Sequence, residues 1–178
     1  MKGEGLLKEL RDNKTFAKKF LLGISGAIFG IIITYIYYPK IPYRIGLIST
    51  PSIYEKIVVY ELKNVDKVKK DKLYVFTFPK DTPYYKKGEV FIKYAKCVEG
   101  DKLEVKGLNY YCNGKLIGKA KTHDSKGKEV KKFTYNGIIP KDKIFMYAPH
   151  KDSYDSRYWG FLDKGKIIGE GKWQILGW

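Results

Sequence analysis

The longest apolar segment of the chain is the run FLLGISGAIFGIIITYIYY at residues 20–38, which contains no charged residue. Its 19 residues come close to the roughly 20 that a helix needs to cross a bilayer. Buried helices of soluble proteins are rarely apolar on all sides for this length. The run is longer than the apolar core of a cleaved signal peptide, and no small-residue cleavage site follows it. The pattern predicts one transmembrane helix at 20–38, preceded by a polar segment at 1–19.

Beyond residue 38 the apolar residues recur in short runs that are rich in Val, Ile and Tyr and are separated by turn residues. Asn113-Gly114 is a strong signal for a two-residue hairpin. Residues 39–178 are therefore predicted to form one compact all-β domain, and the fold class is mainly β. The expected strands are 56–62, 73–78, 89–98, 103–105, 109–112, 115–120, 143–147 and 166–171.

One lysine interrupts the apolar face of the strand EVFIKYAKCV at 89–98. Period-two alternation puts Lys93 on the same face as Phe91, Ala95 and Cys97. A lysine in this setting has two interpretations. It is a charged residue that protects a sheet edge, or it is a desolvated amine that loses its proton easily.

The segment FMYAPHKDSYDSRYWG at 145–160 begins as a strand and continues through a turn. Asp155 and Arg157 lie two residues apart and directly before Tyr158 and Trp159, which suits a partly buried ion pair that holds a loop in place. The alternative is a surface loop with scattered polar residues.

The chain has 178 residues and a formal charge of +16. Residues 1–19 contain 6 basic residues (Lys and Arg) and 3 acidic ones (Asp and Glu), and residues 40–178 contain 29 basic and 16 acidic ones. The positive charge is therefore spread through the chain and does not form a tail. Lysines spread in this way usually form a solvated face, which argues against nucleic acid as a partner.

Charge next to the predicted span indicates its orientation. Lys14, Lys18 and Lys19 precede it and favour a cytoplasmic N-terminus, although Lys40 and Arg44 on the other side weaken the bias. The body is then expected outside the cytoplasmic membrane, with the lipid bilayer as a partner.

Gly26 and Gly30 form a G-x-x-x-G pattern in the span that suits a weak helix-mediated homodimer. His123 and His150 lack metal-ligand spacing, and neither a metal nor another cofactor is expected. Cys97 and Cys112 fall in adjacent predicted strands and are either a disulfide in an oxidising compartment or free thiols, with Cys97 packed in the core.

Three segments resemble sequence boxes of the type I signal peptidases and the TraF-like conjugative-transfer peptidases, which are membrane-anchored serine proteases with a Ser/Lys dyad. Residues 153–160, SYDSRYWG, resemble S-x-D-S-R-Y-W/F-G. Residues 92–101, IKYAKCVEGD, resemble the lysine box, with Lys93 eight residues before Asp101. Residues 49–54, STPSIY, resemble the nucleophile box S-x-P-x-G-L/I-Y, from which they differ by one deleted position and the absent glycine.

The resemblance implies a role for each matching residue. Ser49 would be the nucleophile and Lys93 its general base, with Ser153 orienting the lysine and Asp155 and Arg157 bracing the loop. Ser52 is the rival nucleophile, because the deletion after Pro51 shifts the local register. The backbone N–H of Ser49 would hold the oxyanion, and Thr50 or Ser52 would replace the side-chain donor that Leu47 does not supply.

The implied function is cleavage of exported pre-proteins or pilin-like subunits by a membrane-anchored serine endopeptidase. The short catalytic body and the turn APHKD at 148–152 favour the TraF-like branch. The alternatives are a general type I signal peptidase of the cell, or an inactive homologue that acts as a basic membrane-tethered β-module.

Overall fold

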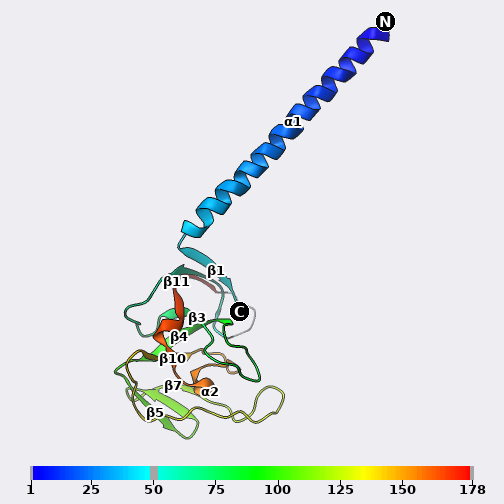
Figure 1. Ribbon diagram of the computed structural model, residues 1–178. Helices are drawn as coiled ribbons and strands as arrows, with labels where there is room; N and C mark the ends of the chain where they lie inside the picture. The colour runs from blue at the N-terminus through cyan, green and yellow to red at the C-terminus, as the bar shows by residue number, and fades with distance from the viewer. Residues whose placement is uncertain (1, 49–51, 177–178) are drawn as a thin grey trace. The chain divides into compact units, whose positions relative to one another are not determined.

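The structure is a computed structural model, and it describes residues 2–48 and 52–176 (Figure 1). Contacts within the chain divide it into two units, Met1–Pro42 and Tyr43–Trp178.

The first unit is a helix. α1 runs over Lys2–Tyr37, so the polar segment and the apolar run form one continuous helix, which passes into the short 3-10 helix η1 at Tyr38–Lys40. Pro39 lacks a backbone N–H and ends the α-helix at the expected place. Among the described residues one helix, over residues 13–40, is long and apolar enough to cross a membrane. The side chains of residues 17–40 are exposed all round, as suits a helix that faces lipid.

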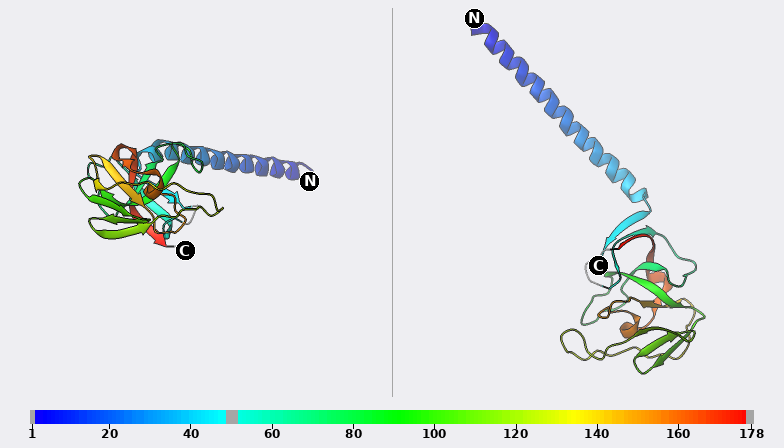
Figure 2. Two further views of the ribbon diagram at one scale, coloured as in Figure 1. Left: turned by 90° about the horizontal axis from the view of Figure 1, so that it is seen from below. Right: turned by 180° about the vertical axis from the view of Figure 1, so that it is seen from behind.

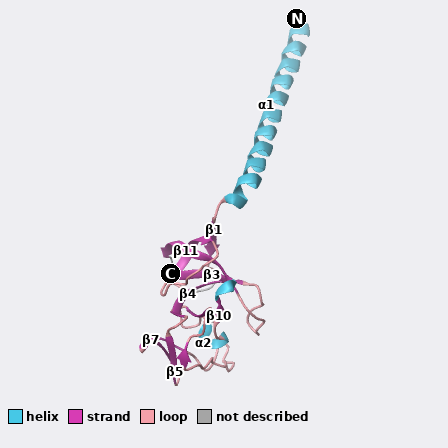
Figure 3. Ribbon diagram, turned by 60° about the vertical axis from the view of Figure 1, so that its left-hand side comes forward, coloured by secondary structure: helices cyan, strands magenta, loops and turns pink. Residues whose placement is uncertain are grey.

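The second unit is built from two antiparallel sheets (Figure 3), which confirms the mainly β fold class. The larger sheet has seven strands in the order β1-β2-β11-β3-β4-β9-β10. Their bounds are Tyr43–Leu47 for β1, Glu55–Leu62 for β2, Leu73–Thr77 for β3, Val90–Val98 for β4, Lys143–Tyr147 for β9, Leu162–Asp163 for β10 and Ile167–Leu176 for β11.

The smaller sheet has four strands in the order β7-β6-β5-β8. These are β5 at Lys102–Lys106, β6 at Asn109–Cys112, β7 at Lys115–Lys119 and β8 at Gly137–Ile138. The predicted hairpin is confirmed, since Asn113 and Gly114 both adopt positive φ (50° and 78°) between β6 and β7. Within the second unit, β1 and β5 lie at opposite ends (Figure 2).

The core is apolar and rich in aromatic side chains. Its largest fully buried members come from both sheets, among them Tyr74, Phe76, Phe78, Leu103, Tyr110, Ile144, Phe145 and Met146. β4 lies between β3 and β9, and the residues on its buried face are Lys93, Ala95 and Cys97. The alternation read from the sequence is therefore correct.

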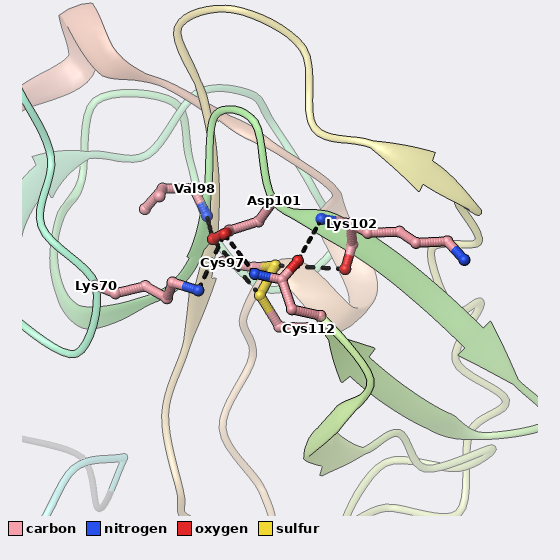
Figure 4. Close-up of a disulfide and its surroundings, with 7 residues drawn as sticks. Lys70, Cys97, Val98, Asp101, Lys102 and Cys112 are labelled. Atoms are coloured by element: carbon pink, nitrogen blue, oxygen red, sulfur yellow. Dashed lines mark hydrogen bonds and ion pairs between the residues drawn. A yellow bond between two sulfur atoms is a disulfide. The ribbon is translucent and has the colours of Figure 1, made fainter.

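A disulfide links the two sheets. Cys97 in β4 is bonded to Cys112 in β6 (Figure 4), which decides between the bridge and the free thiols. Next to it Asp101 accepts hydrogen bonds from the backbone N–H of Val98 (2.9 Å) and from Asn113 Nδ2 (2.8 Å). Cys97, Cys112 and Asp101 lie close enough together to suggest a metal site. The two sulfur atoms are bonded to each other, however, so neither cysteine offers a thiolate to a metal ion.

The structure departs from the predicted elements in six places. β1, β8 and β10 were not expected, and the last two have only two residues each. β11 continues to Leu176, five residues beyond the predicted end. A one-turn helix, α2 at Ser156–Trp159, lies where an ordered loop was expected, and the 3-10 helix η2 at Lys164–Lys166 follows β10. Elements this short carry no periodic pattern by which a sequence could indicate them.

Candidate active site

Lys93 is a buried amine. Its side chain extends from the buried face of β4, the residue is 5% exposed, and Nζ donates a hydrogen bond of 2.9 Å to Ser153 Oγ. The ring of Phe91 lies beside it, 5.7 Å from Nζ to the ring centroid. Tyr74, itself buried, is the residue directly opposite on β3. An amine in these apolar surroundings has lost most of its hydration.

The loss of hydration sets the charge state of this lysine. Burial lowers the pKa of Lys93 to about 8, although the negative charge of Asp155 raises it and the positive charge of Arg157 lowers it further. β4 is an interior strand with β3 and β9 on its two sides, so the interpretation of Lys93 as an edge residue is wrong. The amine can reach the neutral form near physiological pH.

Asp155 and Arg157 form the buried ion pair that the sequence indicated, and the surface-loop alternative is wrong. Nε and Nη2 of Arg157 each donate to one oxygen of the Asp155 carboxylate, at 2.8 Å in both cases. The same carboxylate accepts the backbone N–H groups of Arg157 (3.1 Å) and Ala148 (3.0 Å), so it caps α2 and also fixes the end of β9. The pair therefore holds the loop that carries Ser153.

Arg157 also reaches the smaller sheet. Its Nη1 donates to the carbonyl oxygen of Lys119 at the end of β7 (2.6 Å), and its guanidinium lies over the rings of Tyr147 (4.7 Å) and Tyr158 (5.6 Å). A glycine allows this close approach, because a Cβ at Gly118 would lie 2.4 Å from the ring of Tyr147. The loop is thus anchored on both sheets.

Two buried hydroxyl groups support the same loop, and neither was predicted from the sequence. Ser156 Oγ accepts the backbone N–H of Met146 in β9 (2.8 Å). The hydroxyl of Tyr110 lies 2.9 Å from the carbonyl oxygen of Arg157 and 2.5 Å from that of Phe133. Ser156 lies inside the D-S-R box, and that position could have indicated its role in the loop. No sequence pattern indicated a role for Tyr110.

The expected nucleophile Ser49 lies outside the described residues, as do Thr50 and Pro51. The described residues that flank them are held in place. The backbone N–H of Ile48 donates to the carbonyl of Lys56 (2.9 Å), and the carbonyl of Ser52 accepts the N–H of His150 (3.2 Å). His150 in turn accepts the N–H of Ser153 at its carbonyl (3.1 Å). Ser52 therefore lies beside the turn that leads to Ser153.

Ser52, the rival nucleophile, is buried, with 8% exposed. Its hydroxyl has no hydrogen bond to Lys93 in the described part of the chain, where the partner of Lys93 Nζ is Ser153. The structure therefore brings together four of the five predicted site residues: Lys93, Ser153, Asp155 and Arg157.

A second buried acid lies near the start of β2. Glu55 is 3% exposed and accepts a hydrogen bond from the hydroxyl of Tyr94 at Oε1, whereas its Oε2 has no partner among the described residues. Burial, followed by the hydrogen bond to Glu55, raises the pKa of Tyr94. Neither residue was predicted as a site residue from the sequence.

Comparison with known proteins gives one family. Residues 17–176 match the family described as signal peptidase, peptidase S26. The chain is 34% identical over 80 residues to a probable conjugal transfer protein TraF of Sinorhizobium fredii. It is 30% identical over 83 residues to a probable signal peptidase I-2 of Synechocystis.

These matches cover 44% and 46% of this chain, and the chain spans only 42% and 36% of the lengths of those two relatives. Among solved structures, a signal peptidase I of Enterococcus faecalis is similar at 20% identity with a TM-score of 0.39, over 60% of this chain and 97% of that one.

Proposed function

The chain belongs to the signal peptidase family, peptidase S26, and on that premise we propose that it is a serine endopeptidase with Ser49 as nucleophile and Lys93 as general base. The observation that carries this proposal is the buried amine of Lys93. Its pKa is lowered to about 8, and its hydrogen bond to Ser153 Oγ orients it. A serine hydroxyl is a weak nucleophile unless a neighbouring base takes its proton. A neutral amine is such a base, and an ammonium is not.

The proposed reaction is acyl transfer in two steps. Ser49 Oγ attacks the carbonyl carbon of the scissile peptide while its proton passes to Lys93 Nζ. The tetrahedral intermediate collapses, the C–N bond breaks, and Lys93 returns the proton to the leaving amine. In the second step Lys93 takes a proton from water as that water attacks the acyl ester. When the ester C–O bond breaks, Lys93 returns the proton to Ser49 Oγ, which restores the serine hydroxyl and the neutral amine.

The other predicted residues act through Lys93. Ser153 accepts one N–H of the amine at 2.9 Å and so directs its lone pair, which is the part that must accept the proton. Asp155 and Arg157 hold Ser153 by fixing both ends of its loop. No step requires a metal or another cofactor, because the base and the nucleophile are both side chains.

We propose exported pre-proteins or pilin-like subunits as the substrates. The relative named as a conjugal transfer protein supports a role in conjugation, and the relative named as a signal peptidase supports the second candidate, the general signal peptidase of the cell. The third candidate, an inactive basic β-module at the membrane, is disfavoured by the buried amine, since a purely structural module gains nothing from a desolvated lysine.

We place α1 in the cytoplasmic membrane with its N-terminus inside and residues 40–178 outside, where exported chains emerge. The apolar surface of the helix supports the span, and Lys14, Lys18 and Lys19 support the orientation. Protease added to intact spheroplasts should digest the body. Digestion only after lysis would place the body in the cytoplasm.

The decisive experiment measures cleavage of a membrane pre-protein by the full chain and by a set of variants. Ser49→Ala, Lys93→Ala and the double variant should all fall to the same background, because each residue acts only through the other. Lys93→Arg should be equally inactive, since guanidinium does not lose its proton near neutrality.

Lys96→Ala is the matched control. Lys96 lies on the same strand but on the opposite face, where its Nζ is 2.5 Å from the carboxylate of Asp71, and this variant should retain most of the activity. Cleavage that survives Ser49→Ala but is lost in Ser52→Ala would assign the nucleophile to Ser52 and contradict the proposal.

A further inference from the structure

A pocket of about 480 Å³ opens beside Ser153. Three separate segments of the second unit line it, around residues 83–85, 121–130 and 151–158. The first segment follows β3, the second follows β7, and the third precedes and includes α2. Because Ser153 also holds the amine of Lys93, the pocket is adjacent to the proposed general base.

One wall of the pocket is aromatic. Tyr154 is stacked on Tyr85 and on Tyr158, with ring centroids 5.6 Å apart in both pairs, and Tyr84 lies 5.1 Å from it. All four rings line the pocket. A stack of rings fixed in this way gives a flat surface against which the planar groups of an extended peptide can pack.

The charged residues of the pocket are mostly lysines. Lys121, Lys126, Lys128 and Lys151 line it with two acids, Asp124 and Asp152, so four positive charges face two negative ones.

The two acids already have partners. Asp152 pairs with Lys121, and Asp124 accepts the backbone N–H groups of Lys126 (2.8 Å) and Lys128 (2.9 Å). In the part of the chain that the structure describes, the side chains of Lys126, Lys128 and Lys151 form no ion pair. Hydrogen bonds from these partners lower the pKa of both carboxyls, and the nearby charges of Lys128 and Lys151 lower it further. No carboxylate of the described residues contacts the three ammonium groups directly.

The lysine-rich segment 121–130 is exposed along most of its length but is ordered against the rest of the pocket. His123 and Glu129 form a β-bridge, and Val130 N–H donates to the carbonyl of Thr122 (2.8 Å). The hydroxyl of Tyr84 donates to Asp124 across the pocket (2.9 Å). A lysine-rich segment that only kept the protein soluble would not require this hydrogen bond to another loop.

We propose that this pocket binds an acidic segment of the substrate close to the scissile bond. The inference rests on the proposed peptidase function, since it takes the occupant to be the chain that Lys93 helps to cleave. A peptide that reaches Lys93 passes Ser153 and therefore the pocket. Carboxylate side chains on that peptide would meet the unpaired ammonium groups, and its backbone would lie along the tyrosines.

The test uses the full chain in an uncharged detergent and pairs of peptides that differ only in charge. One member of each pair carries two glutamates within four residues of the cleaved bond, on one side or the other, and its partner carries two glutamines there. We expect about five-fold higher kcat/KM for the glutamate peptide on one of the two sides at low salt, from two partly exposed charge pairs. In 1 M salt, where the Debye length is about 3 Å, the preference should nearly disappear.

Variants locate the effect. Lys126→Gln/Lys128→Gln should abolish the preference for glutamate, so that this variant cleaves the glutamate and glutamine peptides with equal kcat/KM. The matched control is Lys67→Gln/Lys131→Gln, which removes two exposed lysines that do not line the pocket, and it should leave the preference unchanged. Equal cleavage of both peptides by the unmodified chain overturns the proposal, and so does a preference that survives in Lys126→Gln/Lys128→Gln.

Two further measurements separate the remaining outcomes. Anisotropy of fluorescent peptides reports binding without catalysis. Tighter binding of the glutamate peptide by a chain that never cleaves would support the pocket as a site for acidic peptides and refute the peptidase function. Bicelles with and without phosphatidylglycerol test a lipid occupant. If the lysine pair changes activity only when that lipid is present, whatever the peptide charge, the pocket binds lipid headgroups and the proposal is wrong.

Discussion

Lys93 and Ser153 lie 60 residues apart in the sequence, yet the Nζ of Lys93 donates a hydrogen bond of 2.9 Å to the Oγ of Ser153. A lysine has four rotatable bonds and, when exposed, samples many directions. Burial restricts this one, and the hydrogen bond to Ser153 fixes one of its N–H groups. The lone pair of the neutral amine is thereby given a direction before any substrate binds.

Ser153→Ala should lower kcat by up to about 10²-fold and change KM little, because the base remains present but loses its orientation. The variant should keep the pH dependence of the unmodified chain at a lower plateau, since Lys93 still provides the base. Cleavage kinetics over a range of pH measure both. An unchanged kcat would show that packing alone orients the amine.

Cleavage should increase as pH rises through about 8. Only the neutral form of Lys93 takes the proton, and burial lowers its pKa to about 8. About a tenth of the amine is neutral at one pH unit below that value and about nine tenths at one unit above it. A profile of kcat/KM against pH measures the rise. A rise centred near the ordinary lysine value of 10.5 would mean that the amine is hydrated in the working protein.

The same pKa shift predicts how stability depends on pH. The folded pKa of Lys93 is below the value of 10.5 for an ordinary lysine, so the unfolded chain binds more protons between the two values and stability rises with pH there. The cost of burying the ammonium is fully present below about pH 8 and is relieved between about 8 and 10.5. Relative to Lys93→Met, the unfolding free energy of the unmodified chain should increase by about 1 kcal/mol from pH 7 to pH 9.

Denaturant unfolding of both chains at the two pH values isolates this contribution, because the other groups titrate alike in both. A difference that stays constant with pH would contradict the burial of a titrating amine. Lys93→Met itself should be more stable than the unmodified chain at pH 7, since it removes a buried charge and keeps an apolar side chain of similar length.

Breaking the pair of Asp155 and Arg157 should be strongly destabilising. Arg157→Met leaves a carboxylate that is 0% exposed without its cation, which typically costs about 3–5 kcal/mol. Adding Asp155→Asn removes the uncompensated charge, so the double variant should be no less stable than Arg157→Met alone. Thermal or denaturant unfolding of the two single variants and the double variant measures the coupling, and simple additivity would show that the two side chains do not act as a pair.

The sequence was sufficient for the features that depend on local order along the chain. Alternation within EVFIKYAKCV correctly placed Lys93, Ala95 and Cys97 on one buried face, because a strand has a strict period of two. The closeness of Asp155 and Arg157 in sequence correctly indicated their ion pair. The turn residues Asn113-Gly114 correctly predicted a hairpin.

Features that depend on contacts between distant segments were not accessible in this way. The edge strand β1 follows two prolines and is held by its antiparallel pairing with β2, in which Tyr43 lies opposite Glu61. No local pattern in the sequence indicates this pairing. The hydrogen bond from the Tyr94 hydroxyl to the Glu55 carboxylate joins residues 39 positions apart. The pocket beside Ser153 is assembled from three loops, and no periodic pattern within one loop indicates the contact of Tyr84 with Asp124.

Removal of the disulfide between Cys97 and Cys112 should lower stability more than activity. The bond closes a loop of 15 residues, and loss of that constraint on the unfolded chain is worth about 3 kcal/mol. Cys97 shares the buried face of β4 with Lys93 but lies four residues beyond it, so the position of the amine should be retained. Cys97→Ala/Cys112→Ala should therefore unfold at lower denaturant concentration and cleave at a similar kcat at 25 °C. A large fall in kcat with little loss of stability would mean instead that the bond between the sheets positions Lys93.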